Sequence, residues 1–345
     1  MKKLFLLVDC RLDDNDKRWF SEGLFIEGYE TVNIGVEHRL SNLIRQGHSG
    51  RIRNYWLQIK QARQTLRNSG KDDVIIVWYS VTGQIMNLMS SWYGGRNLVL
   101  MNFLTPGKRP GILGWMMKKA VSNPRNTILV NSKESIKQYK EMYGLKSDKS
   151  AKFYYFPDVY DDTNKFVRPE ERCLNNSRYF FTGGMSNRDW KLVCEVAKKL
   201  PEEKFVCCAM QKDFESQIDI LPKNVEVHYN LPPKEYYNLM SQSHCVLLPL
   251  RNDSVAGLIN ILKSIQLAVL CCVSDTPATR QYYGAESRNF LLPRDAGAWA
   301  ECAQSISSME EKEYKIAITE LQEYIQNTFS PESALQRLRT VIAEF

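Results

Sequence analysis

Short runs of consecutive apolar residues alternate with helix-periodic segments along this chain. A run such as Val74-Ile75-Ile76-Val77-Trp78 is apolar at every position, which is typical of a strand buried on both faces. The pattern predicts strands at residues 4–8, 30–36, 73–79, 97–103, 127–131, 152–156, 178–182, 204–210, 224–229, 244–248, 268–274 and 289–292. It predicts helices at residues 53–67, 83–92, 112–121, 133–143, 188–200, 233–241, 258–266, 278–283, 296–307, 310–326 and 331–345.

Strands that alternate with helices build right-handed βαβ units and parallel sheets. The alternation occurs in two successive sets, which are separated by the polar stretch 158–177. We therefore expect an α/β protein with two Rossmann-like, doubly wound domains, at residues 1–160 and 161–328. In such sheets ligands bind beyond the carboxyl ends of the strands, so the loops there, in a cleft between two facing sheets, are the expected site.

Composition narrows the class of protein. No apolar run approaches the roughly 20 residues that span a bilayer. The apolar residues 4–8 end at Asp9, which fits a first strand better than a secretory signal. The nine cysteines form no C-x-x-C pair and lie mostly in apolar runs, which indicates reduced thiols in a cytoplasmic protein. The four histidines are scattered, so no metal site and no cofactor are expected.

Charge is distributed unevenly along the chain. Between His38 and Lys133 there are fifteen Lys or Arg residues and two acids, Asp72 and Asp73, so this segment carries +13 and the rest of a chain of net charge +7 carries −6. A field of this sign attracts phosphates, whether on lipid headgroups, lipid-linked substrates or nucleic acid.

Two helical segments in the basic half mix cations with apolar residues, as helices at an anionic membrane surface do. In the first, Trp56, Ile59 and Leu66 are expected on one side, with the cations around the other. The alternative is that Trp56, Trp115 and Met116 are core residues and that the cations are simply solvated. The expected membrane or acceptor-side patch comprises Arg53, Lys60, Arg63, Lys108, Arg109, Lys118 and Lys119.

Two loops of the second half have the chemistry of phosphate sites. The loop after the strand at 178–182 contains Gly183 and Gly184, and Ser186 or Asn187 is expected to cap the next helix beside Arg188. The loop after the strand at 244–248 enters its helix through small residues, which is again an anion-binding geometry. For each loop an ordinary strand-to-helix turn is the alternative. The residues expected in the second loop are Ser254, Ala256, Gly257 and Leu258.

The serial order of these segments resembles the donor domain of family-4-like (group 1) GT-B glycosyltransferases. The resemblance is good over about residues 125–295 and only architectural over the first hundred. The segments that carry it are Ile128-Leu129-Val130-Asn131-Ser132-Lys133-Glu134-Ser135, Phe181-Thr182-Gly183-Gly184 with Arg188, Leu231-Pro232-Pro233-Lys234-Glu235-Tyr236, Ser243-His244-Cys245-Val246-Leu247-Leu248-Pro249-Leu250, Ala256-Gly257-Leu258, Leu262-Lys263-Ser264-Ile265 and Ser274-Asp275-Thr276-Pro277.

The resemblance implies residue roles. Gly183, Gly184 and Arg188 would face the diphosphate of a nucleotide-sugar donor, such as a UDP- or GDP-sugar. The amides of residues 256–258 would bind the same phosphates, and Lys263 would lie near the ribose. Residues 329–345 would form a helix that packs back on the first domain. Val255 and Lys263 stand where the family usually has two glutamates.

The expected function is therefore sugar transfer, in the hexosyltransferase class and without a metal ion, as in bacterial polysaccharide biosynthesis. The acceptor would be a lipid-linked or polysaccharide precursor at the inner face of the cell membrane. The missing glutamates leave an alternative open, a non-catalytic GT-B partner or scaffold of a glycosyltransferase complex. Nucleic-acid binding is a weaker alternative, because no recognised module supports it. The sequence singles out no catalytic base, since Asp9, Asp13, Asp14 and Asp16 fit solvated loop acids.

Overall fold

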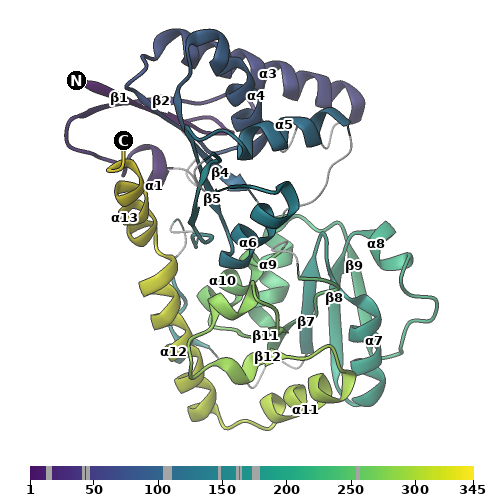
Figure 1. The fold of residues 1–345 in the computed structure, drawn as a ribbon. Coiled ribbons are helices and arrows are strands. Elements are labelled where there is room, and N and C mark those ends of the chain that lie inside the picture. The colour runs from purple at the N-terminus through teal and green to yellow at the C-terminus, as the bar shows by residue number, and fades with distance from the viewer. Residues whose placement is uncertain are drawn as a thin grey trace. The chain divides into compact units, whose positions relative to one another are not determined.

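The computed structural model describes residues 1–12, 18–40, 43, 47–103, 111–146, 149–160, 163, 165–172, 179–253 and 257–345. The chain forms two compact units, each built around its own sheet (Figure 1). Unit 1 comprises Met1–Thr163 and Pro331–Phe345, and unit 2 comprises Asn164–Ser330. The limits expected from the sequence were 1–160, 161–328 and 329–345, within three residues of these.

The sheet of unit 1 has six parallel strands in the order β2-β1-β3-β4-β5-β6. All four residues of β3, Val-Ile-Ile-Val, are buried, as the apolar run predicts. The strands are β1 (Lys2–Leu7), β2 (Tyr29–Ile34), β3 (Val74–Val77), β4 (Asn97–Phe103), β5 (Asn126–Val130) and β6 (Lys152–Tyr155).

Helices cover both faces of this sheet. Side chains of α3 (Gly47–Asn68), α4 (Ser80–Ser90), α5 (Gly111–Val121) and α6 (Lys133–Tyr143) share one core cluster. The opposite face packs against α1 (Arg18–Ser21) and α13 (Pro331–Ile342), with Leu335, Leu338 and Val341 of α13 among the buried residues. The C-terminal helix is thus part of the core of unit 1.

The sheet of unit 2 has six parallel strands in the order β12-β11-β10-β7-β8-β9. Helix α7 packs against α11, and α10 packs against α12. The strands are β7 (Tyr179–Gly184), β8 (Lys204–Ala209), β9 (Val225–Tyr229), β10 (Cys245–Leu248), β11 (Leu270–Ser274) and β12 (Leu291–Leu292). The helices are α7 (Trp190–Lys199), α8 (Gln211–Glu215), α9 (Pro233–Gln242), α10 (Ile259–Gln266), α11 (Ala296–Ser307) and α12 (Glu311–Phe329).

Two parallel sheets flanked by helices confirm the predicted α/β class of two Rossmann-like domains. Each predicted strand has a counterpart whose ends lie within a few residues. The segment predicted as a helix at 278–283 is a 3₁₀ turn, Thr279–Tyr282. The short helices α1 and α8 were not predicted, because four or five residues are too few to show a helical period. None of the helices among the described residues has the length and apolar character needed to cross a bilayer.

Candidate functional site

The loops that follow β7 and β10 lie side by side, because these strands are neighbours in the sheet of unit 2. Arg188 and Leu250 form an isolated antiparallel bridge between the loops. The Asp189 amide donates to the Pro249 carbonyl over 3.0 Å, and the Arg251 amide donates to the Asn187 carbonyl over 3.3 Å. Main-chain hydrogen bonds therefore join the two predicted phosphate loops into one structure.

Arg188 lies at the centre of this structure, with no solvent-exposed surface. Its Nε donates to the Gly183 carbonyl over 2.7 Å, and its terminal nitrogens donate to the carbonyls of Gly257 (3.3 Å) and Ser186 (3.4 Å). Burial lowers the pKa of the guanidinium below its ordinary value. The side chain was expected to face a diphosphate, but it binds the loop carbonyls instead. It thereby holds Gly184 and Gly257 beside each other.

The side chain of Arg188 fits only because two neighbouring residues are glycines without a Cβ atom. Gly184 has φ +150° and Gly257 has φ +84°, both in the region that favours glycine. A Cβ atom on either residue would lie 2.7 Å from a terminal nitrogen of Arg188. Gly184 and Gly257 are thus required by the buried guanidinium as well as by the turns.

Asn260 and Tyr236 extend this structure to α9 and α10. The Asn260 side-chain amide donates to the Gly183 carbonyl over 3.1 Å and to the Tyr236 hydroxyl over 2.9 Å. Burial raises the pKa of Tyr236, so the phenol stays protonated. Sequence reasoning did not single out Asn260. The available signal was one amide in the first turn of an otherwise apolar helix start, Leu258-Ile259-Asn260-Ile261-Leu262.

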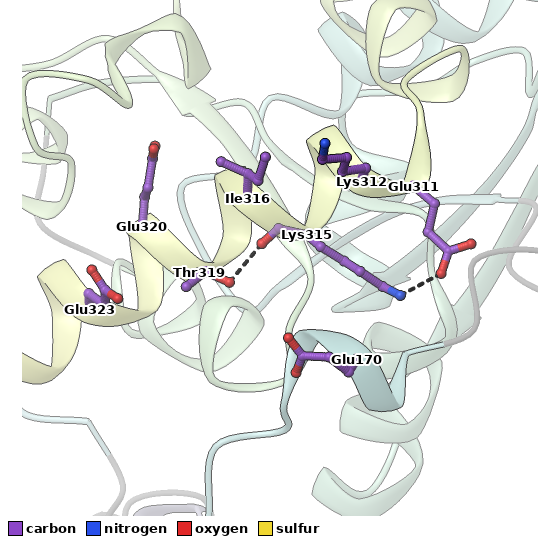
Figure 2. A pocket seen from close by; sticks show the side chains of 8 residues that line it. All are labelled: Glu170, Glu311, Lys312, Lys315, Ile316, Thr319, Glu320 and Glu323. Carbon is purple, nitrogen blue, oxygen red and sulfur yellow. Dashed lines mark hydrogen bonds and ion pairs between the residues drawn. The ribbon is translucent and has the colours of Figure 1, made fainter.

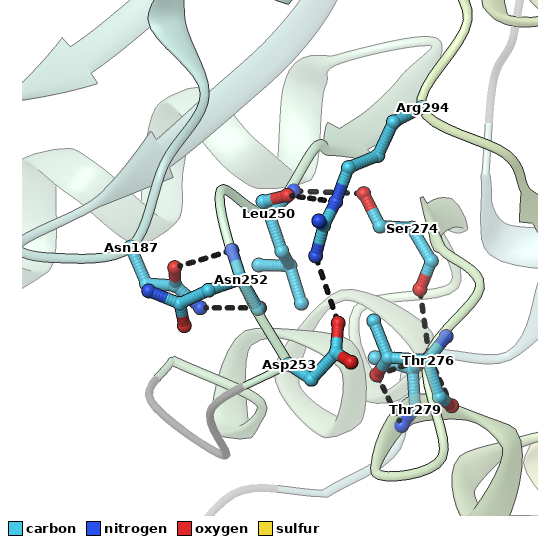
Figure 3. A network of polar contacts seen from close by, with 8 residues as sticks. All are labelled: Asn187, Leu250, Asn252, Asp253, Ser274, Thr276, Thr279 and Arg294. Atoms are coloured by element: carbon cyan, nitrogen blue, oxygen red, sulfur yellow. Dashed lines mark hydrogen bonds and ion pairs between the residues drawn. The ribbon is translucent and has the colours of Figure 1, made fainter.

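The N-terminus of α7 carries a carboxylate. Asp189 caps the helix, and its Oδ1 accepts from the Leu192 amide over 3.0 Å. The expectation that Ser186 or Asn187 would cap α7 is therefore wrong. The Asn187 side chain instead makes a pair of hydrogen bonds with the main chain of Asn252, of 3.1 and 3.2 Å (Figure 3). A carboxylate at this helix start disfavours a phosphate in the same place.

The N-terminus of α10 is different. Among the residues that the structure describes no side chain caps it, and its first turn contains no acid. The Asn260 and Ile261 amides donate to the carbonyls of Gly257 (3.3 Å) and Leu258 (2.9 Å), so any amide offered to an anion comes before them in the chain. The positive end of the helix itself also attracts anions. Gly257 and Leu258 lead into this turn, and their expected binding of phosphate stays a prediction. Ser254 and Ala256, which were predicted to contribute, lie outside the described residues, as does Val255.

A polar network fixes the loop after β10 from the other side (Figure 3). The Arg294 Nε donates to the Leu250 carbonyl over 3.1 Å, and its Nη2 pairs with Asp253 over 2.8 Å. The Leu250 amide donates to the Ser274 hydroxyl over 2.8 Å, and the Thr279 hydroxyl donates to the Ser274 carbonyl. The loops after β7, β10 and β11 are therefore held as one assembly.

Lys263 lies on α10, one turn beyond Asn260. Its Nζ donates to the Gln266 Oε1 over 3.1 Å and lies 5.2 Å from the centre of the Tyr237 ring. The side chain is nearly buried. Its expected position beside a ribose stays a prediction.

The basic residues predicted in unit 1 are on exposed helix faces. Trp56 and Trp115 are 58% and 50% exposed, so the alternative that they are core residues is wrong, whereas Met116 is buried as that alternative held. Lys60 Nζ lies 5.4 Å from the Trp56 ring centre, so the expected separation of cations and aromatic residue on opposite sides is also wrong. Of the predicted patch, Arg53, Lys60, Arg63, Lys118 and Lys119 are exposed, and Lys108 and Arg109 lie outside the described residues.

Unit 2 also has a surface hollow of about 600 Å³ along α12 (Figure 2). Lys315 pairs with Glu311 over 2.6 Å inside it. Its other acids are Glu170, Glu320 and Glu323. It includes no residue of the loops after β7 and β10, so we do not assign it to the candidate site. The described residues contain no group of three or more His, Cys, Asp or Glu side chains that could hold a metal ion.

Comparison with protein-family models and with curated protein sequences gives no match for this chain. Solved structures do match it over its whole length. HepE of Anabaena in complex with UDP has a TM-score of 0.70 at 12% identity, with 100% of both chains covered. An E. coli trehalose-6-phosphate structure bound with UDP-2-fluoro glucose has a TM-score of 0.69 at 8% identity, with 100% of this chain and 99% of that chain covered.

The fold is GT-B. A third GT-B structure, the α,α-trehalose 6-phosphate synthase of Burkholderia multivorans, has a TM-score of 0.62 at 11% identity, with 100% of this chain and 98% of that chain covered. At these identities the likeness concerns the fold. It covers both sheets, including the half of the chain where the sequence resemblance was only architectural.

Proposed function

We propose that this chain is a family-4-like glycosyltransferase of the hexosyltransferase class, and that unit 2 binds the diphosphate of a nucleotide sugar. The observation that carries the proposal is the uncapped start of α10, held beside the loop after β7 by Arg188. Solved structures of the same fold hold UDP or UDP-2-fluoro glucose, which supports a nucleotide-sugar donor here.

The proposed chemistry follows from the place where charge develops. When a glycosyl group leaves, negative charge grows on the nucleoside diphosphate. Main-chain amides and the positive end of a helix stabilise such charge without a metal ion. In this proposal Gly183, Gly184, Gly257 and Leu258 bring the main chain close to the phosphates. Arg188 acts indirectly, by holding the two loops together, and Lys263 contributes its charge near the nucleotide.

The proposed acceptor is a lipid-linked or polysaccharide precursor at the cytoplasmic face of a membrane. The exposed cations of α3 and α5 support it, because they favour an anionic surface near unit 1. The complex of HepE with UDP and glucose shows that this fold can hold a nucleotide together with a sugar.

The test is calorimetric titration of the full chain with UDP-, GDP- and dTDP-sugars. Ile259 is the first residue of α10 and is partly exposed, so it can be changed with little effect on packing. We expect Ile259→Glu to weaken nucleotide binding about tenfold, because a carboxylate at the helix start repels phosphate while favouring the helix. The matched control is Ile259→Gln, which should bind nearly as the original chain does. Failure of every sugar nucleotide to bind the folded chain would contradict the proposal.

The second candidate function is a non-catalytic partner of another glycosyltransferase. The enclosure of Arg188 favours it, because this cation is not presented to a donor. The two candidates are separated by measuring nucleoside diphosphate release with an acceptor extract. The chain is an enzyme if it turns over the donor, if Ile259→Glu lowers this turnover and if Ile259→Gln does not. Nucleotide binding without turnover favours the partner.

A further inference from the structure

Helix α3 has uncharged polar residues on its buried face and several large apolar residues on its exposed face. Asn54, Gln58, Gln61 and Thr65 are buried. The Gln61 side chain donates to the carbonyls of Val8 (3.0 Å) and Ile34 (3.1 Å), and Gln58 donates to the Asn54 side chain over 2.8 Å. The inner face of α3 is thus held to the sheet by hydrogen bonds as well as by apolar packing at Ala62 and Leu66.

The outer face of α3 carries Ile52 (61% exposed), Trp56 (58%) and Ile59 (46%), with Tyr55 at its margin. A helix that only needs to pack on its own sheet turns such residues inward. A hollow of about 550 Å³ runs along this face, lined by Trp56, Ile59, Lys60, Arg63, Gln64, Arg67 and Asn68. An outward apolar face of this kind marks an interaction surface.

The charge around these residues has a single sign. Helix α3 contains no acid and five cations, and none of the five makes an ion pair with another residue that the structure describes. They surround the apolar residues because positions 56, 60, 63 and 67 fall on one side of a helix. The cations are Arg51, Arg53, Lys60, Arg63 and Arg67.

Helix α5 repeats this arrangement on the same face of the sheet. Ile112 is 71% exposed and Trp115 50%, Lys118 and Lys119 follow, and the helix has no acid. Helix α4 lies between α3 and α5, contacts both, and has no exposed residue. The two outward faces therefore belong to one layer (Figure 1), which we name the α3–α5 surface. Both helices begin at the carboxyl edge of the sheet, where α/β proteins bind their ligands.

We propose that the α3–α5 surface docks on an anionic lipid bilayer, with Ile52, Trp56 and Ile112 entering the headgroup region and the cations binding lipid phosphates. Docking would bring the carboxyl edge of unit 1 to a lipid-linked acceptor, and this role rests on the proposed function. The docking itself needs only the surface. Shallow burial of aromatic and aliphatic residues inside a ring of Lys and Arg is how interfacial helices bind anionic membranes.

Other occupants fit this surface less well. A second copy of the chain in a two-fold dimer would set the five cations of α3 against the same five cations. Nucleic acid would satisfy the cations and stack on the tryptophans, but it offers nothing apolar to Ile52, Ile59 and Ile112. A bilayer satisfies both the charge and the apolar residues.

The test is sedimentation of the full chain with vesicles of phosphatidylcholine alone or mixed with phosphatidylglycerol. We expect binding to the mixed vesicles only, weakened by salt. The combined variant Ile52→Ser, Trp56→Ser, Ile59→Ser should bind about tenfold more weakly or worse. Lys60→Gln, Arg63→Gln, Arg67→Gln should lose most of the salt dependence. The control Ile220→Ser, Ile316→Ser, at exposed apolar positions of unit 2, should bind as the original chain does.

Quenching of tryptophan fluorescence by brominated lipids gives a residue-specific readout. The chain has seven tryptophans, and we expect Trp56→Phe to remove more than one seventh of the quenching. Equal binding to both kinds of vesicle, no effect of the apolar variant, or retention on DNA without retention on vesicles overturns the proposal. Vesicle binding is measured without nucleotide, and nucleotide binding without vesicles. A chain that binds vesicles but no nucleotide contradicts only the proposed function, and the converse contradicts only the docking.

Discussion

The two strand-to-helix junctions at β7 and β10 can be compared directly, because they are neighbours in one sheet and both contain glycines at positive φ. The β7 junction ends on the carboxylate of Asp189, which caps α7. The β10 junction ends on a helix start that no side chain of the described residues caps and whose first turn contains no acid. Similar loop chemistry thus gives one junction that is closed by its own cap and one, the open junction, whose helix start no described side chain caps. The difference teaches that a glycine-rich turn does not define a phosphate site until its cap is known.

Removing the link between the junctions should have the largest effect on stability. Arg188→Ala leaves the carbonyls of Ser186 and Gly257 without their donor and opens a cavity, so we expect a loss of about 3 kcal/mol. Urea unfolding measures it. The control is Arg251→Ala, which removes only an exposed pair with Asp213 and should cost less than about 1 kcal/mol. Equal costs for the two variants would show that the buried guanidinium is not the link.

Crowding at the open junction should have the next largest effect. Gly257 and Gly28 share a φ of +84°, but a Cβ on Gly257 would lie 2.7 Å from Arg188, whereas a Cβ on Gly28 would meet nothing within 4 Å. We expect Gly28→Ala to cost about 1 kcal/mol from backbone strain alone and Gly257→Ala about 1 kcal/mol more, from overpacking against Arg188. Chemical denaturation compares them. Equal losses of stability in the two variants would mean that the loop moves to accommodate the added Cβ atom at no cost.

The cap of the closed junction should matter for stability but not for the ligand. Asp189→Ala removes the acceptor of the Leu192 amide, so we expect a loss of about 1 kcal/mol. Asp189→Asn keeps an acceptor and should recover most of it. Nucleotide titration of both variants should give the affinity of the original chain, because phosphate is expected at α10. A strong gain in affinity with Asp189→Asn would instead place the anion at α7.

The smallest effect is expected at the loop after β11, where Asp275 pairs with Arg280 over 2.6 Å. The hydrogen bond from Arg280 lowers the pKa of Asp275. A lowered carboxyl pKa stabilises the folded chain above the ordinary value of about 4, and the contribution is lost as pH falls through the folded value. Asp275→Asn should therefore lower the thermal midpoint by about 1 °C at pH 7. Thermal scans at successively lower pH below about 4 should show the difference shrink.

Much of the fold was accessible from the sequence, because buried parallel strands leave continuous apolar runs such as those of β3 and β10. Asp189 also had a signal, an acid directly before an apolar-periodic helix, which the glycines and Arg188 overshadowed. The burial of Arg188 had no signal in the sequence, because the side chain binds main-chain carbonyls, which every residue has. The faces of α3 were misjudged because its inner face is partly polar. Leu66 is buried there, on a different side from the exposed Trp56, and Lys60 lies beside Trp56.

The position of α13 has a consequence for how the protein is made. Three of its apolar side chains, Leu335, Leu338 and Val341, complete the core of unit 1, and the last residues reach back to the first and sixth strands through Lys2 and Lys152. A ribosome therefore finishes unit 2 before it releases the segment that unit 1 still lacks. The half that begins first is completed last, and a stop codon shortly before residue 331 would spare the later half while leaving the earlier one with an uncovered face.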